Sequence, residues 1–218
     1  MKPTPGQRDG ITTNPRIVLL STEGVTRLPG GVTIDATYAI DGGNTGKTDE
    51  LRAGWLLAQI TSSGLWVPLK RTTVAADFSG SGSGNTGNDL PVANAAAFKA
   101  DDQITVTVAA GTVNVTVSSV NYTQNTLTLD TAVDNPPVGG AVYARGDIAG
   151  AETARCILGE HVKLLDLDDQ VWRDKQAGDV YLAALVDKSQ ILGDVDAART
   201  SGNSELSGIL WGDRQGLT

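Results

Sequence analysis

The stretch AGWLLAQITSSGLWVPL, residues 53–69, decides the fold that this sequence predicts. An apolar run over residues 53–61 is followed by Ser62, Ser63 and Gly64, and then by a second apolar run over residues 65–69. Two apolar segments joined by a short Ser/Gly turn are typical of a β-hairpin, because glycine adopts the positive φ angle that tight turns require. We therefore expect an antiparallel hairpin here, with Trp55 and Trp66 facing each other across it.

The rest of the chain also favours strands. Its 218 residues include 26 glycines and only 5% aromatic residues, which suits short strands joined by tight turns. Apolar and polar residues alternate with a period of two over residues 104–108, 113–120 and 126–129, and at the start of 32–40. One short helix is expected over residues 93–100. The fold class indicated is mainly β.

Composition divides the chain into three parts. Residues 1–30 begin with a Pro-, Gly- and Thr-rich stretch and are expected to form an extended N-terminal arm. A Gly/Ser-rich linker at residues 78–88 opens a self-contained block of strand patterns. We interpret residues 77–150 as a small inserted β domain, and residues 31–76 with 151–218 as the β domain that receives it.

Charge and cysteine content exclude several classes of protein. The net charge is −8, and residues 77–150 alone carry seven acidic and two basic side chains. A chain without a basic cluster is not expected to bind nucleic acid, since that binding depends on neutralising phosphates. A single cysteine, Cys156, excludes an intrachain disulfide. No apolar run approaches the ~18 residues of a membrane helix, and the first residues lack a signal-peptide pattern, so synthesis in a cytosol and no membrane partner are expected.

Two short motifs suggest chemistry that their context argues against. Residues 41–48, DGGNTGKT, resemble a phosphate-binding P-loop, but Asp41 occupies the position of the first glycine and would oppose a phosphate. Residues 145–147 read Arg-Gly-Asp, an integrin-recognition tripeptide that is also ordinary turn chemistry. Both stretches are expected to be loops.

The remaining candidate residues do not form a persuasive active site. His161 is the only histidine, and its odd spacing from Cys156 places the two side chains on opposite faces of a strand. Asp166, Asp168 and Asp169 lack the glycine and the distal glutamate of a calcium-binding loop. We therefore expect no catalytic residue, no metal and no cofactor.

Three stretches carry a resemblance to a known family. Residues 51–68, LRAGWLLAQITSSGLWVP, resemble the lambda-like bacteriophage head decoration proteins in their small-residue strand, Ser-Gly turn and returning strand ending in proline. Residues 154–162, ARCILGEHV, and 181–187, YLAALVD, are similar to the later strands of that family. The resemblance covers residues 50–75 and 151–212 once the insertion is set aside.

The resemblance implies a small β-barrel or β-tulip-like decoration domain and a structural, non-enzymatic role. Such proteins form trimers on the outer surface of the expanded phage capsid, at its three-fold positions, where they bind the major capsid protein and stabilise the shell. An apolar strand after a loose arm often pairs with another chain. We therefore assign the capsid contact to Ile17, Val18, Leu19 and Leu20, and trimer or core packing to Trp55, Trp66 and Trp211.

Other interpretations remain open at this point. Residues 16–20 equally fit an ordinary first strand of the domain. The inserted β unit and the tryptophans also fit a receptor- or carbohydrate-binding module of a phage tail or fibre. A third hypothesis is a small hydrolase, which requires Asp166, Asp168 and His161 to meet in one pocket.

Overall fold

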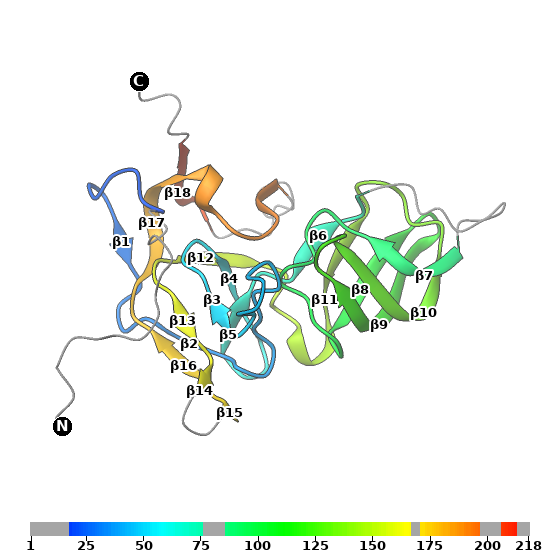
Figure 1. Ribbon diagram of the computed structural model, residues 1–218. Helices are drawn as coiled ribbons and strands as arrows, with labels where there is room; N and C mark the ends of the chain where they lie inside the picture. The colour runs from blue at the N-terminus through cyan, green and yellow to red at the C-terminus, as the bar shows by residue number, and fades with distance from the viewer. Residues whose placement is uncertain (1–17, 76–85, 167–170, 197–205, 213–218) are drawn as a thin grey trace.

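The computed structural model describes residues 18–75, 86–166, 171–196 and 206–212. Two β lobes lie side by side in Figure 1. One lobe contains the strands from both ends of the chain, and the other is built from the middle of the sequence. The sheets of both lobes are curled (Figure 1). The fold is mainly β, as the sequence predicted.

The first lobe is organised around one large sheet. Its strands are β1 (Thr26–Arg27), β2 (Val32–Ile34), β4 (Leu56–Gln59), β5 (Trp66–Pro68), β12 (Ala154–Leu158), β16 (Lys175–Ala177), β17 (Val180–Asp187) and β18 (Gly208–Gly212). They follow the order β1-β17-β12-β4-β5-β2-β16, and β18 pairs in parallel with β17. Strand β12 therefore lies between β4 and β17, which brings residues from before and after the second lobe into one sheet.

Two short ladders complete the first lobe. Strand β3 (Glu50–Leu51) pairs with β13 (Val162–Lys163), and β14 (Leu165–Asp166) pairs with β15 (Val171–Trp172). A 3₁₀ turn, η2 (Lys188–Gln190), follows β17. The side chain of Asp187 begins this turn by accepting a hydrogen bond from the backbone N–H of Ser189, at 3.0 Å.

The predicted hairpin is confirmed. Strands β4 and β5 pair antiparallel, and Gly64 has a φ of +73° in the turn between them. The register places Trp66 opposite Gln59, whereas Trp55 lies before β4 and forms an isolated bridge with Leu192. The expectation that Trp55 and Trp66 face each other was therefore wrong, because the hairpin register pairs Trp66 with Gln59, four residues after Trp55.

The central sheet is buried on both faces. Leu57 packs into one apolar cluster, whereas its neighbours Leu56 and Ala58 pack into another. The same division separates Cys156 from Ile157 in β12. Successive side chains of a strand point to opposite faces of the sheet. A strand that lies between two apolar cores therefore needs apolar residues at successive positions. This explains why residues 53–61 read as a continuous apolar run without alternation.

The second lobe has its own sheet and core. Its strands are β6 (Arg71–Thr73), β7 (Thr86–Pro91), β8 (Gln103–Val108), β9 (Gly111–Asn121), β10 (Thr126–Asp134) and β11 (Ala141–Ala144), in the order β6-β11-β8-β9-β10-β7. The apolar side chains between them form a separate cluster that includes Leu90, Phe98, Ile104, Val117 and Leu127. A 3₁₀ turn, η1 (Gly146–Ile148), leads back to the first lobe. Because β6 pairs with β11, the second sheet begins before residue 77.

Two local predictions differ from the structure. Residues 93–100 form turns and no helix, because their backbone groups bond to neighbouring segments: Ala93 donates to the carbonyl of Thr73, and Ala95 donates to the side chain of Asn125. Strand β2 ends at Ile34, since the carboxylate of Asp35 accepts hydrogen bonds from the next backbone N–H groups and starts a turn.

Three other segments of the sequence can also be compared with the structure. Residues 181–187, which carry part of the resemblance, lie in strand β17. Residues 208–212 form strand β18. Of the predicted linker at residues 78–88, residues 78–85 lie outside the described residues, and residues 86–88 belong to strand β7 and not to a linker.

Candidate functional site

The predicted capsid-contact residues lie against strand β17. Ile17 is outside the described residues. The carbonyl of Val18 accepts a hydrogen bond from Asp187, Leu19 forms an antiparallel bridge with Val186, and Leu20 donates to the carbonyl of Leu185. Residues 18–20 are therefore paired within their own sheet, as the alternative interpretation of an ordinary first strand expected.

Burial separates the members of this stretch. Val18 is only 3% exposed and belongs to the apolar cluster that also contains Ile157 and Val186. Leu19 and Leu20 are half-buried. The side chain of Val18 is thus enclosed by its own chain. Among residues 18–20, only Leu19 and Leu20 have side chains exposed enough to contact a second molecule.

Strand β18 pairs with the edge of β17 opposite to the one that residues 18–20 occupy, and only the side chain of Leu20 reaches it. It pairs with β17 from Ala183↔Gly208 to Asp187↔Gly212, and a Cβ at Gly212 would lie 2.4 Å from the Cδ1 atom of Leu20. Trp211 packs against the core, whereas Leu210 is 64% exposed. Within the described part of the chain, β18 pairs only with β17 and so forms an edge of the sheet. We call Leu19, Leu20 and β18 the β18 edge surface.

The tryptophans have different environments. Trp55 is fully buried, Trp66 packs half-buried against the same core, and Trp211 packs against the core on the other face of the sheet. All three therefore pack against the cores of their own chain, with Trp66 and Trp211 left partly exposed. Trp172 is different: it is 40% exposed beside the 48% exposed Val171 in strand β15.

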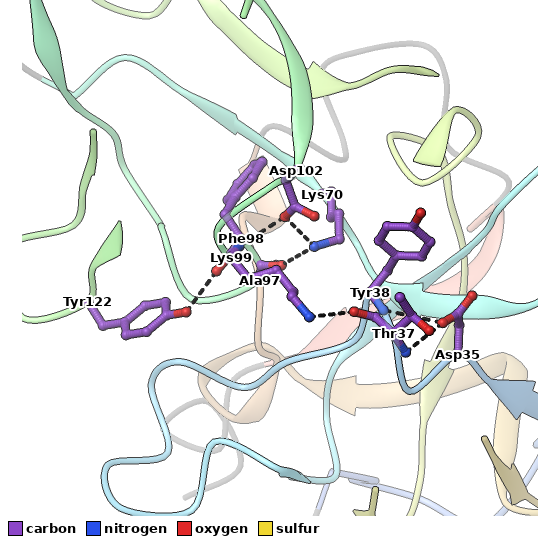
Figure 2. Close-up of polar contacts among 9 residues, drawn as sticks. All are labelled: Asp35, Thr37, Tyr38, Lys70, Ala97, Phe98, Lys99, Asp102 and Tyr122. Carbon is purple, nitrogen blue, oxygen red and sulfur yellow. Dashed lines mark hydrogen bonds and ion pairs between the residues drawn. The ribbon is translucent and has the colours of Figure 1, made fainter. Parts of the chain in front are cut away.

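A buried ion pair lies where the two lobes meet. Lys70, between β5 and β6, donates from Nζ to Oδ2 of Asp102 at 2.5 Å and to the carbonyl of Ala97 at 2.7 Å (Figure 2). The side chains of Lys70 and Asp102 are 0% and 1% exposed. The same carboxylate oxygen also accepts from the backbone N–H of Lys99, at 2.9 Å. A fully buried lysine is stable only when its charge and its donors are matched in this way.

Further polar contacts surround this ion pair (Figure 2). Nζ of Lys99 donates to the carbonyl of Thr37, which joins the second lobe to the turn after β2. The hydroxyl of Tyr122, which follows β9, donates to the carbonyl of Phe98 at 2.9 Å. Gly42 donates to the carbonyl of Ala96 at 2.8 Å. The lobes are therefore joined by directed hydrogen bonds as well as by the covalent chain.

Burial sets the protonation behaviour at the junction. It lowers the pKa of Lys70, and the charge of Asp102 opposes that change. Burial, with a smaller contribution from Asp102, raises the pKa of Tyr122 to about 12. Burial also raises the pKa of Tyr38, aided by nearby carboxylates. Both tyrosines are therefore neutral hydrogen-bonding groups at ordinary pH.

The stretch that resembles a P-loop is a loop with a different purpose. Asp41 is fully buried, and its carboxylate accepts from Nε and Nη2 of Arg52 at 2.7 and 2.8 Å. This bidentate ion pair holds the start of the loop against Arg52, the residue that directly follows strand β3. The position that a phosphate-binding glycine would need is therefore used to hold the loop in place.

The residues of the hydrolase hypothesis have separate partners. Nδ1 of His161 lies 3.4 Å from Glu50, whereas Asp166 lies 3.4 Å from Nε of Arg173. Asp168 and Asp169 are outside the described residues. Cys156 is buried in the core, and burial raises the pKa of its thiol to about 12, which makes it a poor nucleophile. Of the three residues of this hypothesis, the two described ones, His161 and Asp166, therefore have different ion-pair partners.

Two simple functional features are absent from the described residues. Among residues 18–75, 86–166, 171–196 and 206–212, no three His, Cys, Asp or Glu side chains are grouped to hold a metal ion. In the same ranges no helix has the length and apolar character to cross a membrane. Residues 145–147 lie at the 3₁₀ turn η1, with Gly146 at a φ of +62°, in line with the expected turn.

Comparison with known proteins identified no relative of this chain. No protein-family description, curated protein or solved structure matches this chain.

Proposed function

We propose that this chain is a structural virion protein that binds the outer surface of an expanded phage capsid as a trimer and stabilises the shell. The observation that carries the proposal is the way two distant stretches combine. Residues 50–75 and 151–212 bear the resemblance to head decoration proteins, and their strands β4, β5, β12, β17 and β18 lie in one sheet around shared cores. A decoration domain interrupted by an insertion requires this arrangement.

The β18 edge surface is the part of this domain that best suits a contact with the major capsid protein. The backbone of an edge strand offers donors and acceptors for a strand of another chain. Leu210 adds an exposed apolar side chain at the centre of β18, and Val18, the first described residue, pairs with the same strand, β17, as β18 does. Both features favour a capsid segment that pairs with β18 while the predicted arm extends over the shell.

Stabilisation then follows from mass action. A protein that binds the expanded shell, and not the unexpanded one, favours the expanded state by its binding free energy at every site. Many copies on one closed lattice make the total large. The second lobe carries a net negative charge and is fixed to the first by the contacts around Lys70, so in this proposal it projects outward as a rigid body.

Shell stability is the direct test of this role. Heads filled with DNA but lacking this protein are prepared from the phage that encodes it, and DNA release is followed during heating. Added protein is expected to raise the release temperature. A version lacking residues 1–15 is expected to protect less at equal concentration, because in this proposal the predicted arm extends over the shell and contacts it. Equal release temperatures with and without the full-length protein would overturn the proposal.

A further inference from the structure

An open groove lies between the two lobes. Its walls are the loop at residues 42–48 of the first lobe and the turn between β9 and β10, residues 120–123, of the second, and its volume is about 430 Å³. This volume falls within the range of small-molecule sites. The lining residues are Gly42, Thr45, Gly46, Thr48, Val120, Asn121, Tyr122 and Thr123. None of them is charged, in a chain whose net charge is −8.

Both walls are held in place before any ligand arrives. The ion pair of Asp41 with Arg52 fixes one end of the loop, and the side chain of Asn44 donates to the carbonyl of Glu50 at 3.0 Å. Gly42 lies directly against the ring of Tyr122, since a Cβ at position 42 would be 2.1 Å from Cε1 of that ring. A site with preformed walls loses little conformational entropy on binding.

The chemistry of the groove selects among ligand classes. Hydroxyls of Thr45, Thr48 and Thr123 each offer one donor and two acceptors, whereas none of the lining residues is a cation that could neutralise a phosphate or a carboxylate. The half-buried ring of Tyr122 adds an apolar surface, and its own hydroxyl is already engaged by the carbonyl of Phe98. Hydroxyl donors and acceptors around an aromatic ring match the alternating hydroxyl and C–H surfaces of a sugar.

We propose that this groove binds a neutral saccharide. The ring of Tyr122 packs against the C–H face of a sugar, and the threonine hydroxyls bind its hydroxyl groups. Such a site goes beyond shell stabilisation, because it gives a capsid-bound protein an affinity for glycans. The two functions are separable: the groove is formed by residues 42–48 and 120–123, whereas the β18 edge surface is formed by Leu19, Leu20 and β18.

The test is an amide-resolved NMR titration of the full-length protein. The probes are the neutral disaccharides maltose, lactose, cellobiose and N,N′-diacetylchitobiose, with 3′-sialyllactose and inorganic phosphate as charged comparators. Saturable shifts confined to residues 42–48 and 120–123 with at least one neutral sugar are expected. The absence of saturable shifts with every neutral sugar at millimolar concentration, or saturation by phosphate alone, would overturn the proposal.

Matched variants separate binding in the groove from binding elsewhere. Thr48→Val removes one hydroxyl without changing the size of the side chain, and we expect it to weaken binding about threefold to tenfold, as the loss of one neutral hydrogen bond does. Thr112→Val makes the same change at an exposed position of β9 outside the groove, and is expected to leave the dissociation constant unchanged. Equal affinities of these two variants would contradict the proposed site. Shell binding by Thr48→Val is expected to match that of the unaltered protein.

Discussion

Lys70 and Asp102 form a fully buried ion pair at the junction of the two lobes, with Nζ 2.5 Å from Oδ2. Lys70 lies in the connection from β5 to β6, and Asp102 immediately precedes β8. The pair therefore ties the segment that enters the second lobe to the first strand of its central hairpin. Removing water from two charges is costly, so this arrangement depends on the pair remaining complete.

Replacing one partner of this pair is expected to be more harmful than replacing both. Lys70→Met leaves the carboxylate of Asp102 buried without its cation, and we expect a loss of about 3–5 kcal/mol in the free energy of unfolding. The double variant Lys70→Met/Asp102→Asn removes the stranded charge and keeps an acceptor for the backbone N–H of Lys99. Urea unfolding followed by circular dichroism measures both. A double variant less stable than Lys70→Met would contradict this account.

The contact of Gly42 with Tyr122 is expected to tolerate no side chain. Gly42→Ala places a methyl group 2.1 Å from the ring of Tyr122, so the ring or the loop must move, at a cost of about 1–3 kcal/mol. Gly178→Ala is the matched control, because the nearest atom to its Cβ is 3.8 Å away. Thermal unfolding compares the two. Equal melting temperatures for the two variants would show that the ring does not rest on Gly42.

The thiol of Cys156 is expected to make stability fall at high pH. Its pKa is raised by burial from an ordinary value of 9.0 to about 12, so between these values the unfolded chain releases a proton that the folded chain retains. Stability is then unaffected below pH 9 and declines as the pH rises towards 12. Urea unfolding of the protein and of Cys156→Ala at several pH values measures this dependence. The same slope between pH 9 and 10 in both proteins would contradict the assignment.

Substitutions at Val18 and at Leu210 are expected to distinguish an effect on folding from an effect on shell binding. Val18→Ser places a hydroxyl in the core and is expected to cost about 2 kcal/mol. Leu210→Ser changes an exposed side chain, so its effect on stability is expected to stay within about 0.5 kcal/mol. Leu210→Ser is nevertheless expected to weaken binding to expanded capsids. Unchanged capsid affinity for Leu210→Ser would exclude the β18 edge surface as the contact.

The sequence predicted those parts of the fold that depend on local patterns. The hairpin around Gly64 was predicted because turn glycine and flanking apolar runs are adjacent in the chain. The positions of β8, β9 and β10 in the second lobe were predicted because alternation with a period of two directly indicates a sheet with one buried face. Residues 93–100 were wrongly predicted as a helix, since their backbone partners, such as Thr73 and Asn125, are distant in sequence.

The junction between the lobes was not predictable in the same way. Lys70 is separated from Asp102 by 32 positions, and nothing adjacent to either residue signals that both are buried. The one available signal was a lysine directly after the apolar run that ends at Leu69. The groove likewise depends on the tertiary placement of the loop at 42–48 against the turn at 120–123.

Cosedimentation with capsids tests the central claim most directly. Purified protein is mixed with expanded and unexpanded capsids of the phage that encodes it, and the bound copies are counted. We expect saturable binding to the expanded shell alone, at about three copies per three-fold position, as a closed trimer requires. The absence of binding to either shell, or equal binding to both, would contradict the account.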